Sequence, residues 1–195
     1  MRGRVRREGG VSTVIDPRTV GATIWLTGLP SSGKSTIAAA LADVLCEEGH
    51  RVQVLDGDEI RATLSSDLGF SRADRITNVQ RIGLLARTQA THGVKVLAPV
   101  IAPYACSRDD VRAGHAAHGV WFVEVHIATA VEVCARRDVK GLYRRRRAGE
   151  IRGLTGVDDP YEIPDRPELR VETDGLTVAE SVKHIYTALA ERGLV

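Results

Sequence analysis

The sequence predicts an α/β fold, in which helices cover both faces of a parallel sheet. Short runs rich in β-branched residues alternate with segments of helical periodicity, which is the pattern of strand–helix–strand units. The 195-residue chain is 43% hydrophobic and 27% charged, close to the averages of globular proteins. This length suits one domain with a full core. We therefore expect a single domain over residues 21–195, preceded by a flexible basic arm over residues 1–20.

The individual elements follow in chain order. Between the first two expected strands, Ile37, Leu41 and Val44 recur at helical spacing, and Gly49 provides a stop. A second helix is predicted over residues 75–92, and a third begins at the T-x-x-E capping pattern of Thr177 and Glu180. The expected strands are residues 22–27, 52–55, 94–101, 120–128 and 169–172. Residues 141–168, rich in Arg, Gly, Asp and Pro, make a long connection, which is either functional or disordered.

Charge and cysteine content narrow the class of protein. The formal net charge of +2 is too small to demand a nucleic acid or an anionic membrane as partner. The three cysteines are far apart and in no metal-ligand spacing, which is typical of a reduced protein without structural zinc. No uncharged stretch is long enough to cross a bilayer, and no secretory apolar segment follows the basic start. We expect a cytoplasmic protein without a nucleic-acid or membrane partner.

The stretch GLPSSGKST, residues 28–36, has the G-x-x-x-x-G-K-[ST] spacing of a phosphate-binding P-loop and lies between an expected strand and a helix. In such a loop, backbone N–H groups and the helix N-terminus face phosphate oxygens. Lys34 would reach the terminal phosphates, and Ser35 would bind magnesium. An ordinary strand-to-helix turn is the alternative. The context favours ATP as the phosphate donor.

The stretch LDGDEIR, residues 55–61, follows the second expected strand, whose carboxyl end should face the ligand crevice. The two carboxylates, Asp56 and Asp58, can hold magnesium and accept a proton from an attacking hydroxyl. The alternative is an Asp-Gly turn with a helix cap at Asp58. Arg61 lies one helical turn after Asp58, which favours a functional crevice.

Together with three longer stretches, these motifs closely resemble the adenylylsulfate kinase (APS kinase) family of P-loop kinases. The three stretches are GFSRADRITNVQRIG, IAPYACSRDDVR and RDVKGLYRRRRAGEIRGLTGVDDPYEIPDRPEL. The resemblance runs from about residue 23 to the last helix. It implies a three-layer P-loop kinase fold and transfer of the γ-phosphate of ATP to the 3′-hydroxyl of adenosine 5′-phosphosulfate (APS), which gives PAPS. It further implies Mg²⁺, a homodimer and, as a possible partner, a sulfate adenylyltransferase.

The resemblance also implies roles for individual residues. Lys34 and Asp58 would be catalytic, Asp58 as the base for the acceptor hydroxyl, and Ser35 and Asp56 would serve the metal. The ATP phosphates would lie on Pro30, Ser31, Ser32, Gly33, Lys34, Ser35 and Thr36. The acceptor would lie on Asp58, Arg61, Phe70, Arg75, Asn78, Ile101, Ala102, Lys140, Gly153 and Leu154.

The residue types agree with these roles, because a flat base joined to a compact dianion needs an apolar face and cations. Alternatives remain open at three places. Phe70 could belong to the core, and Arg75 and Asn78 alone would read as a solvated helix face. The arginines of residues 144–147 could form a lid, a solvated basic helix or a nucleic-acid patch. We interpret them as a lid with glycine hinges.

Two positions depart from the family pattern. Many members have Ser where this chain has Ala102, and alanine cannot carry a phosphoryl group, which predicts direct transfer from ATP to the acceptor. Leu154 replaces the usual Phe and should weaken acceptor binding by up to roughly tenfold. These departures leave two rivals to an APS kinase: a related P-loop small-molecule kinase with a changed acceptor, and a non-catalytic nucleotide-binding subunit of a sulfate-activation complex.

Overall fold

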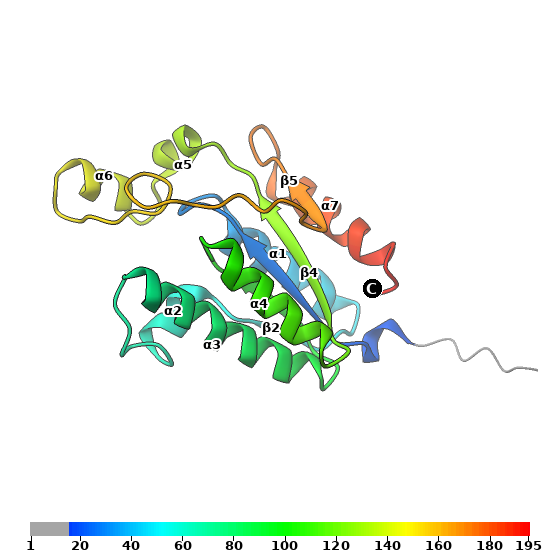
Figure 1. Cartoon of the computed structure of the whole chain (residues 1–195). Helices are drawn as coiled ribbons and strands as arrows, with labels where there is room; N and C mark the ends of the chain where they lie inside the picture. The colour runs from blue at the N-terminus through cyan, green and yellow to red at the C-terminus, as the bar shows by residue number, and fades with distance from the viewer. Residues whose placement is uncertain (1–15) are drawn as a thin grey trace, which may run out of the picture.

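A computed structural model describes residues 16–195 and confirms the α/β fold (Figure 1). All five predicted strands are present, and every neighbouring pair is parallel, in the order β2-β3-β1-β4-β5. Four strands are one to three residues shorter than predicted, because the end residues of the predicted runs do not join the ladder. Their bounds are β1 Ala22–Thr27, β2 Val52–Val54, β3 Lys95–Pro99, β4 Trp121–Ile127 and β5 Leu169–Val171.

The three predicted helices are present as α1 (Lys34–Glu47), α3 (Arg72–Ala90) and α7 (Val178–Ala190). The capping box at Thr177 and Glu180 is confirmed by both of its reciprocal hydrogen bonds. Helix α3 begins three residues earlier than predicted, because Ser71 and Asp74 form a second capping box. Two helices were not predicted, since one is strongly polar and the other short: α4 (Ala105–Ala116) and α5 (Val131–Arg137). Two further helices correspond to alternatives considered from the sequence: α2 (Gly57–Ala62) to a helix that begins near Asp58, and α6 (Leu142–Arg147) to the basic helix.

The sheet has a hydrophobic core on each face, as the three-layer prediction requires. Along β1, Ile24 and Leu26 pack in the core that contains α1 and α7, whereas Trp25 packs in the core that contains α3. This division follows from the alternation of side chains along a strand. Because both faces are covered, β1 is apolar over nearly its whole length and all of its residues are buried.

The chain before β1 differs from the predicted flexible arm, which was expected to reach residue 20. Pro17–Thr19 form a 3-10 turn capped by Asp16. The buried Lys95 fixes this segment, because its Nζ atom donates hydrogen bonds to the carbonyls of Pro17 and Val20. The prediction of a flexible arm is therefore wrong for residues 16–20, and residues 1–15 lie outside the described part.

The long connection predicted over residues 141–168 is neither disordered nor wholly irregular. It begins with α6, and the only ladder contact it makes in the described chain is an isolated bridge between Thr155 and Asp159. In Figure 1 this segment and α5 extend beyond the carboxyl ends of β1 and β4. No helix within residues 16–195 is long and apolar enough to cross a membrane.

Candidate active site

A cavity of about 870 Å³ opens at the carboxyl ends of the strands, where the P-loop, α2, α3 and the α5–α6 segment meet. In an open parallel sheet this edge is where ligands bind. Of the residues predicted for the site, Asp56 alone does not line the cavity. The predicted residues that do line it are Pro30, Ser31, Ser32, Gly33, Lys34, Ser35, Thr36, Asp58, Arg61, Phe70, Arg75, Asn78, Ile101, Ala102, Lys140, Gly153 and Leu154.

The P-loop offers an uncapped helix N-terminus to this cavity. Gly33 adopts a φ of 102°, a left-handed conformation that glycine tolerates, and α1 begins at the next residue. No side chain caps the first turn of α1, so its N–H groups are available to an anion. The local chain therefore forms the phosphate cradle that the motif predicts.

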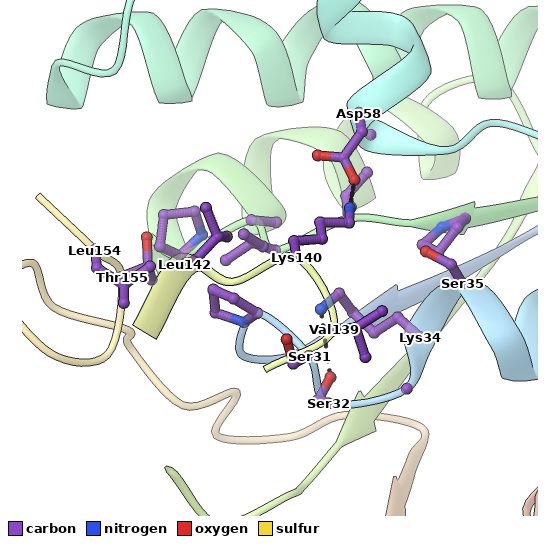
Figure 2. Close-up of a pocket in the computed structure, with 18 of the residues that line it drawn as sticks. Ser31, Ser32, Lys34, Ser35, Asp58, Val139, Lys140, Leu142, Leu154 and Thr155 are labelled. Carbon is purple, nitrogen blue, oxygen red and sulfur yellow. Dashed lines mark hydrogen bonds and ion pairs between the residues drawn. The ribbon is translucent and has the colours of Figure 1, made fainter. Parts of the chain in front are cut away.

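Lys34 is held by the loop itself. Its Nζ atom donates hydrogen bonds to the carbonyls of Gly28 at 2.9 Å and Leu29 at 2.7 Å. It also donates to the Ser32 hydroxyl at 3.3 Å (Figure 2). Burial among these groups lowers the pKa of Lys34 to about 7. In the protein without ligand, this ammonium is poorly solvated and has no carboxylate partner among residues 16–195.

Two oxygen atoms suited to a hard cation lie beside the loop. The Ser35 hydroxyl donates a 2.6 Å hydrogen bond to Oδ2 of Asp56. The other carboxylate oxygen of Asp56 accepts the Asp58 N–H at 2.9 Å and caps α2. The helix cap considered for Asp58 is therefore wrong, because Asp56 occupies the cap position and leaves the Asp58 side chain free for the cavity.

Asp58 faces Lys140 across the cavity. Figure 2 shows the Lys140 side chain extending from the α5–α6 connection toward the Asp58 carboxylate, with which it forms an ion pair. Both side chains remain accessible, at 68% for Asp58 and 54% for Lys140. The ion pair joins the two sides of the cavity, and each partner can still be reached by a ligand.

Phe70 forms an exposed aromatic platform in the lining of the cavity. Its relative exposure is 68%, so the alternative that it belongs to the core is wrong. The guanidinium carbons of Arg61 and Arg75 lie 4.8 Å and 5.9 Å from the ring centroid. Arg61 is fixed by a 2.7 Å hydrogen bond to the Gly69 carbonyl. An aromatic face flanked by two cations suits a planar ligand that carries negative charge.

Arg75 and Asn78 are not a solvated helix face, so that alternative is also wrong. Arg75 donates hydrogen bonds to the Thr155 hydroxyl at 2.6 Å and the Gly153 carbonyl at 2.7 Å, and pairs with Asp159 at 3.1 Å. Asn78 is buried, and its Oδ1 atom accepts no hydrogen bond within residues 16–195. A buried acceptor without a protein partner is costly, and because Asn78 lines the cavity, its Oδ1 atom is a candidate acceptor for a ligand there.

Leu154 is buried in a small apolar cluster with Cys134 and Tyr143, although it also lines the cavity. The arginines after Tyr143 lie in α6 and are exposed, as the basic-helix alternative has it. Arg145 also lines the cavity, but closure of a lid over a ligand stays a prediction.

Sequence reasoning missed the residues that close the P-loop end of the cavity. Arg137 donates hydrogen bonds to the carbonyls of Ser32 at 3.2 Å and Thr173 at 3.3 Å, which ties α5 and the segment after β5 to the loop. Arg137 begins the RDVKGLY stretch that carries part of the family resemblance, and Lys140 of the same stretch was assigned to the site, so this signal could have found Arg137. Thr173 and Ser181, which also line the cavity, carry no sequence signal.

Comparisons with known proteins agree with this geometry. A family model described as adenylylsulphate kinase matches residues 20–172. The chain is 48% identical over 175 residues to an adenylyl-sulfate kinase of Microcystis aeruginosa, covering 90% of this chain and 94% of that protein. It is 50% identical over 173 residues to one of Rippkaea orientalis, covering 89% and 93%.

Solved structures give the same result. The APS kinase CysC of Mycobacterium tuberculosis, in complex with AMPPNP and APS, superposes with a TM-score of 0.85 at 44% identity, covering 87% of this chain and 98% of that one. A gluconokinase of Sinorhizobium meliloti, at 18% identity and a TM-score of 0.58, covers 90% and 95% and shares the fold. From the family model and these relatives, the chain belongs to the adenylylsulphate kinase family.

Proposed function

We propose that the protein transfers the γ-phosphate of ATP to the 3′-hydroxyl of adenosine 5′-phosphosulfate, giving ADP and PAPS. The observation that carries this function is the single cavity, which joins a phosphate cradle to an aromatic and cationic platform. Membership of the family and the M. tuberculosis relative bound to AMPPNP and APS support the same reaction.

At the donor end, residues 30–36 would hold the ATP phosphates with backbone N–H groups and the α1 N-terminus. Lys34 would exchange its bonds to the Gly28 and Leu29 carbonyls for bonds to the terminal phosphates. This exchange replaces neutral acceptors by anionic ones, which form stronger hydrogen bonds. Arg137 lies against the same loop and adds positive charge there.

The pair of Ser35 and Asp56 fits Mg²⁺. Their oxygens are 2.6 Å apart, and magnesium at nucleotide sites takes one or two protein oxygens together with phosphates and water. When bound, the ion would neutralise charge on the β- and γ-phosphates. No further protein ligand is required for this role.

At the acceptor end, the adenine would stack on Phe70 and against Leu154, and Arg61 and Arg75 would neutralise the phosphosulfate. The unpaired Oδ1 atom of Asn78 would accept a hydrogen bond from the acceptor. These roles follow from charge and shape at the platform, and each is testable by substitution.

Asp58 would receive the proton of the 3′-hydroxyl as the oxygen attacks the γ-phosphorus in line and the bond to ADP breaks. The acceptor hydroxyl would compete with Lys140 for the carboxylate, so acceptor binding frees Lys140 for the developing negative charge. Ala102 lines the cavity and carries no nucleophile, so the phosphoryl group passes directly from ATP to the acceptor. Positioning and charge stabilisation supply the catalysis.

A steady-state assay of ADP and PAPS formation with APS as acceptor tests the function directly. Phosphorylation of another alcohol without turnover of APS would identify a kinase with a changed acceptor. Nucleotide binding without any turnover would identify a non-catalytic subunit. The Ser35→Ala variant serves as the donor-site control and should require a higher magnesium concentration for half-maximal rate.

We further propose that residues 21–195 fold as one domain and that two copies form a homodimer. A relative described as a hexameric APS kinase, from Thiobacillus denitrificans, supports self-association within the family. It is 39% identical, with a TM-score of 0.70, and this chain covers 30% of its length. Light scattering that gives a monomeric mass would contradict the dimer.

A sulfate adenylyltransferase, whose reaction class supplies the acceptor, is the proposed partner enzyme.

A further inference from the structure

The segment after β3 forms the floor of the acceptor end of the cavity, through Ile101, Ala102 and Pro103. Ala102 adopts a φ of 42°, in the left-handed region that residues other than glycine rarely occupy. Such a conformation persists only where surrounding contacts hold it, and it is common at binding sites. The contacts that hold this floor therefore determine the shape offered to the acceptor.

Two side chains fix the carbonyl groups of this floor. The Thr27 hydroxyl donates a 2.6 Å hydrogen bond to the Ile101 carbonyl, and Nη1 of Arg108 donates one of 2.7 Å to the Ala102 carbonyl. Within residues 16–195, the N–H groups of Ile101 and Ala102 donate to no protein acceptor. The carbonyls of Ile101 and Ala102 thus have protein partners, and the N–H groups of the same two residues can donate hydrogen bonds to a ligand.

Arg108 itself does not touch the cavity. It is 3% exposed and is absent from the residues that line the cavity. Its Nη1 atom donates to the Ala102 carbonyl and its Nη2 atom to the Glu162 carbonyl at 2.8 Å, whereas Nε lies 2.8 Å from Oε1 of Glu124 as an ion pair without hydrogen-bond geometry. A planar guanidinium suits three fixed partners in this way, whereas a lysine does not.

Through the Glu162 carbonyl, Arg108 also ties the floor to the long connection that follows α6. Glu162 donates its N–H to the Pro103 carbonyl at 2.8 Å, and its carboxylate accepts the Ala105 N–H at 2.7 Å at the start of α4. The preceding residue, Tyr161, shares a 3.1 Å hydrogen bond with the Thr27 hydroxyl. Residues 161–162 are thus joined to the floor, to Thr27 and to the start of α4 by hydrogen bonds besides the one from Arg108.

We infer that Arg108 is a positioning residue for the acceptor. It holds the Ala102 backbone in its left-handed conformation and fixes it to Glu162, in the long connection that follows α6. This inference rests on the proposed function, since it assumes that the floor receives the acceptor. None of its three partners belongs to the P-loop, so removal of Arg108 affects the acceptor and leaves the donor site unchanged.

The chain offers a matched control in Arg112, which lies one helical turn later on α4. Arg112 pairs with the same Glu124, at 3.0 Å, and with Glu168, but makes no contact with the floor or with Glu162. Arg108→Met and Arg112→Met each remove one arginine from Glu124. Only Arg108→Met removes the hydrogen bonds to the Ala102 and Glu162 carbonyls, and only Arg112→Met removes the ion pair with Glu168.

The test measures steady-state kinetics of both variants with each substrate varied in turn, after the parent chain is shown to turn over APS. For Arg108→Met, we expect the KM for APS to rise by about tenfold or more, because a buried hydrogen bond to a charged group is lost, while the KM for ATP stays within twofold. For Arg112→Met, both KM values should stay within twofold. An unchanged KM for APS in Arg108→Met, or equal increases for both substrates, would overturn the inference.

If Arg108→Met does not fold, Arg108→Lys decides the question, because it keeps the buried positive charge but lacks the planar fork that reaches the Ala102 and Glu162 carbonyls together. A KM for APS raised by about threefold or more with the KM for ATP unchanged supports the inference. An unchanged KM for APS overturns it. A parent chain without APS turnover would instead refute the proposed function, so the two failures are distinguishable.

Discussion

The Asp58→Asn variant tests the proposed catalytic base. Asparagine keeps the size of the side chain and cannot accept the proton, so kcat should fall by about 10² to 10⁴, equivalent to about 2.7–5.4 kcal/mol in the activation free energy. The ion pair with Lys140 is lost as well. Because both side chains are more than half exposed, the pair contributes at most about 1 kcal/mol to stability. The free energy of unfolding should therefore change little while turnover collapses.

The assay follows ADP release at saturating ATP and APS, and urea unfolding of the same samples measures stability. Glu59→Gln is the control, because Glu59 is an exposed neighbour on α2 that does not line the cavity. It should retain the parent kcat, and ATP affinity should be preserved in both variants. A fall in kcat of less than about tenfold in Asp58→Asn would refute the role of Asp58 as base.

Three further predictions concern the donor site, the acceptor site and the core. Burial lowers the pKa of Lys34 to about 7, so above that pH the free amine must take up a proton when ATP binds. Calorimetry of ATP binding in several buffers at pH 8 should therefore detect uptake of close to one proton. The Lys34→Met variant should abolish this uptake. Between pH 7 and 9, ATP affinity should decrease as pH rises, and a flat profile would contradict this reasoning. Leu154→Phe should tighten APS binding by up to about tenfold through aromatic contact, and a displacement titration that shows no tightening would refute it. Gly83→Ala would place a methyl group 2.5 Å from Cγ2 of Val111, so urea unfolding should show a loss of about 1–3 kcal/mol that Val111→Ala largely relieves.

The outcome at individual residues shows what limits prediction from sequence. The P-loop and α1 were predictable, because the glycine spacing and the helical periodicity are local properties. Helix α4 was missed because the residues that it buries include the polar Ser107, Arg108 and His115, so that no apolar stripe is visible. The sequence did not show which of two neighbouring aspartates, Asp56 or Asp58, caps α2. The local geometry assigns the cap to Asp56, and its role at the metal stays a prediction.

The sequence by itself determined the five strands, three of the helices, the phosphate-binding motif, and the family whose later motifs name the acceptor, because each depends on residues close together in the chain. Only the tertiary structure decided that Phe70 is exposed while Asn78 is buried, and that Arg137 meets the P-loop. It alone showed that Arg108 joins Ala102 to Glu162, which lies 54 residues after Arg108 in the chain. Residues so far apart in the chain meet because parallel strands bring their carboxyl ends to one edge of the sheet. Local sequence patterns therefore do not predict their burial or their partners.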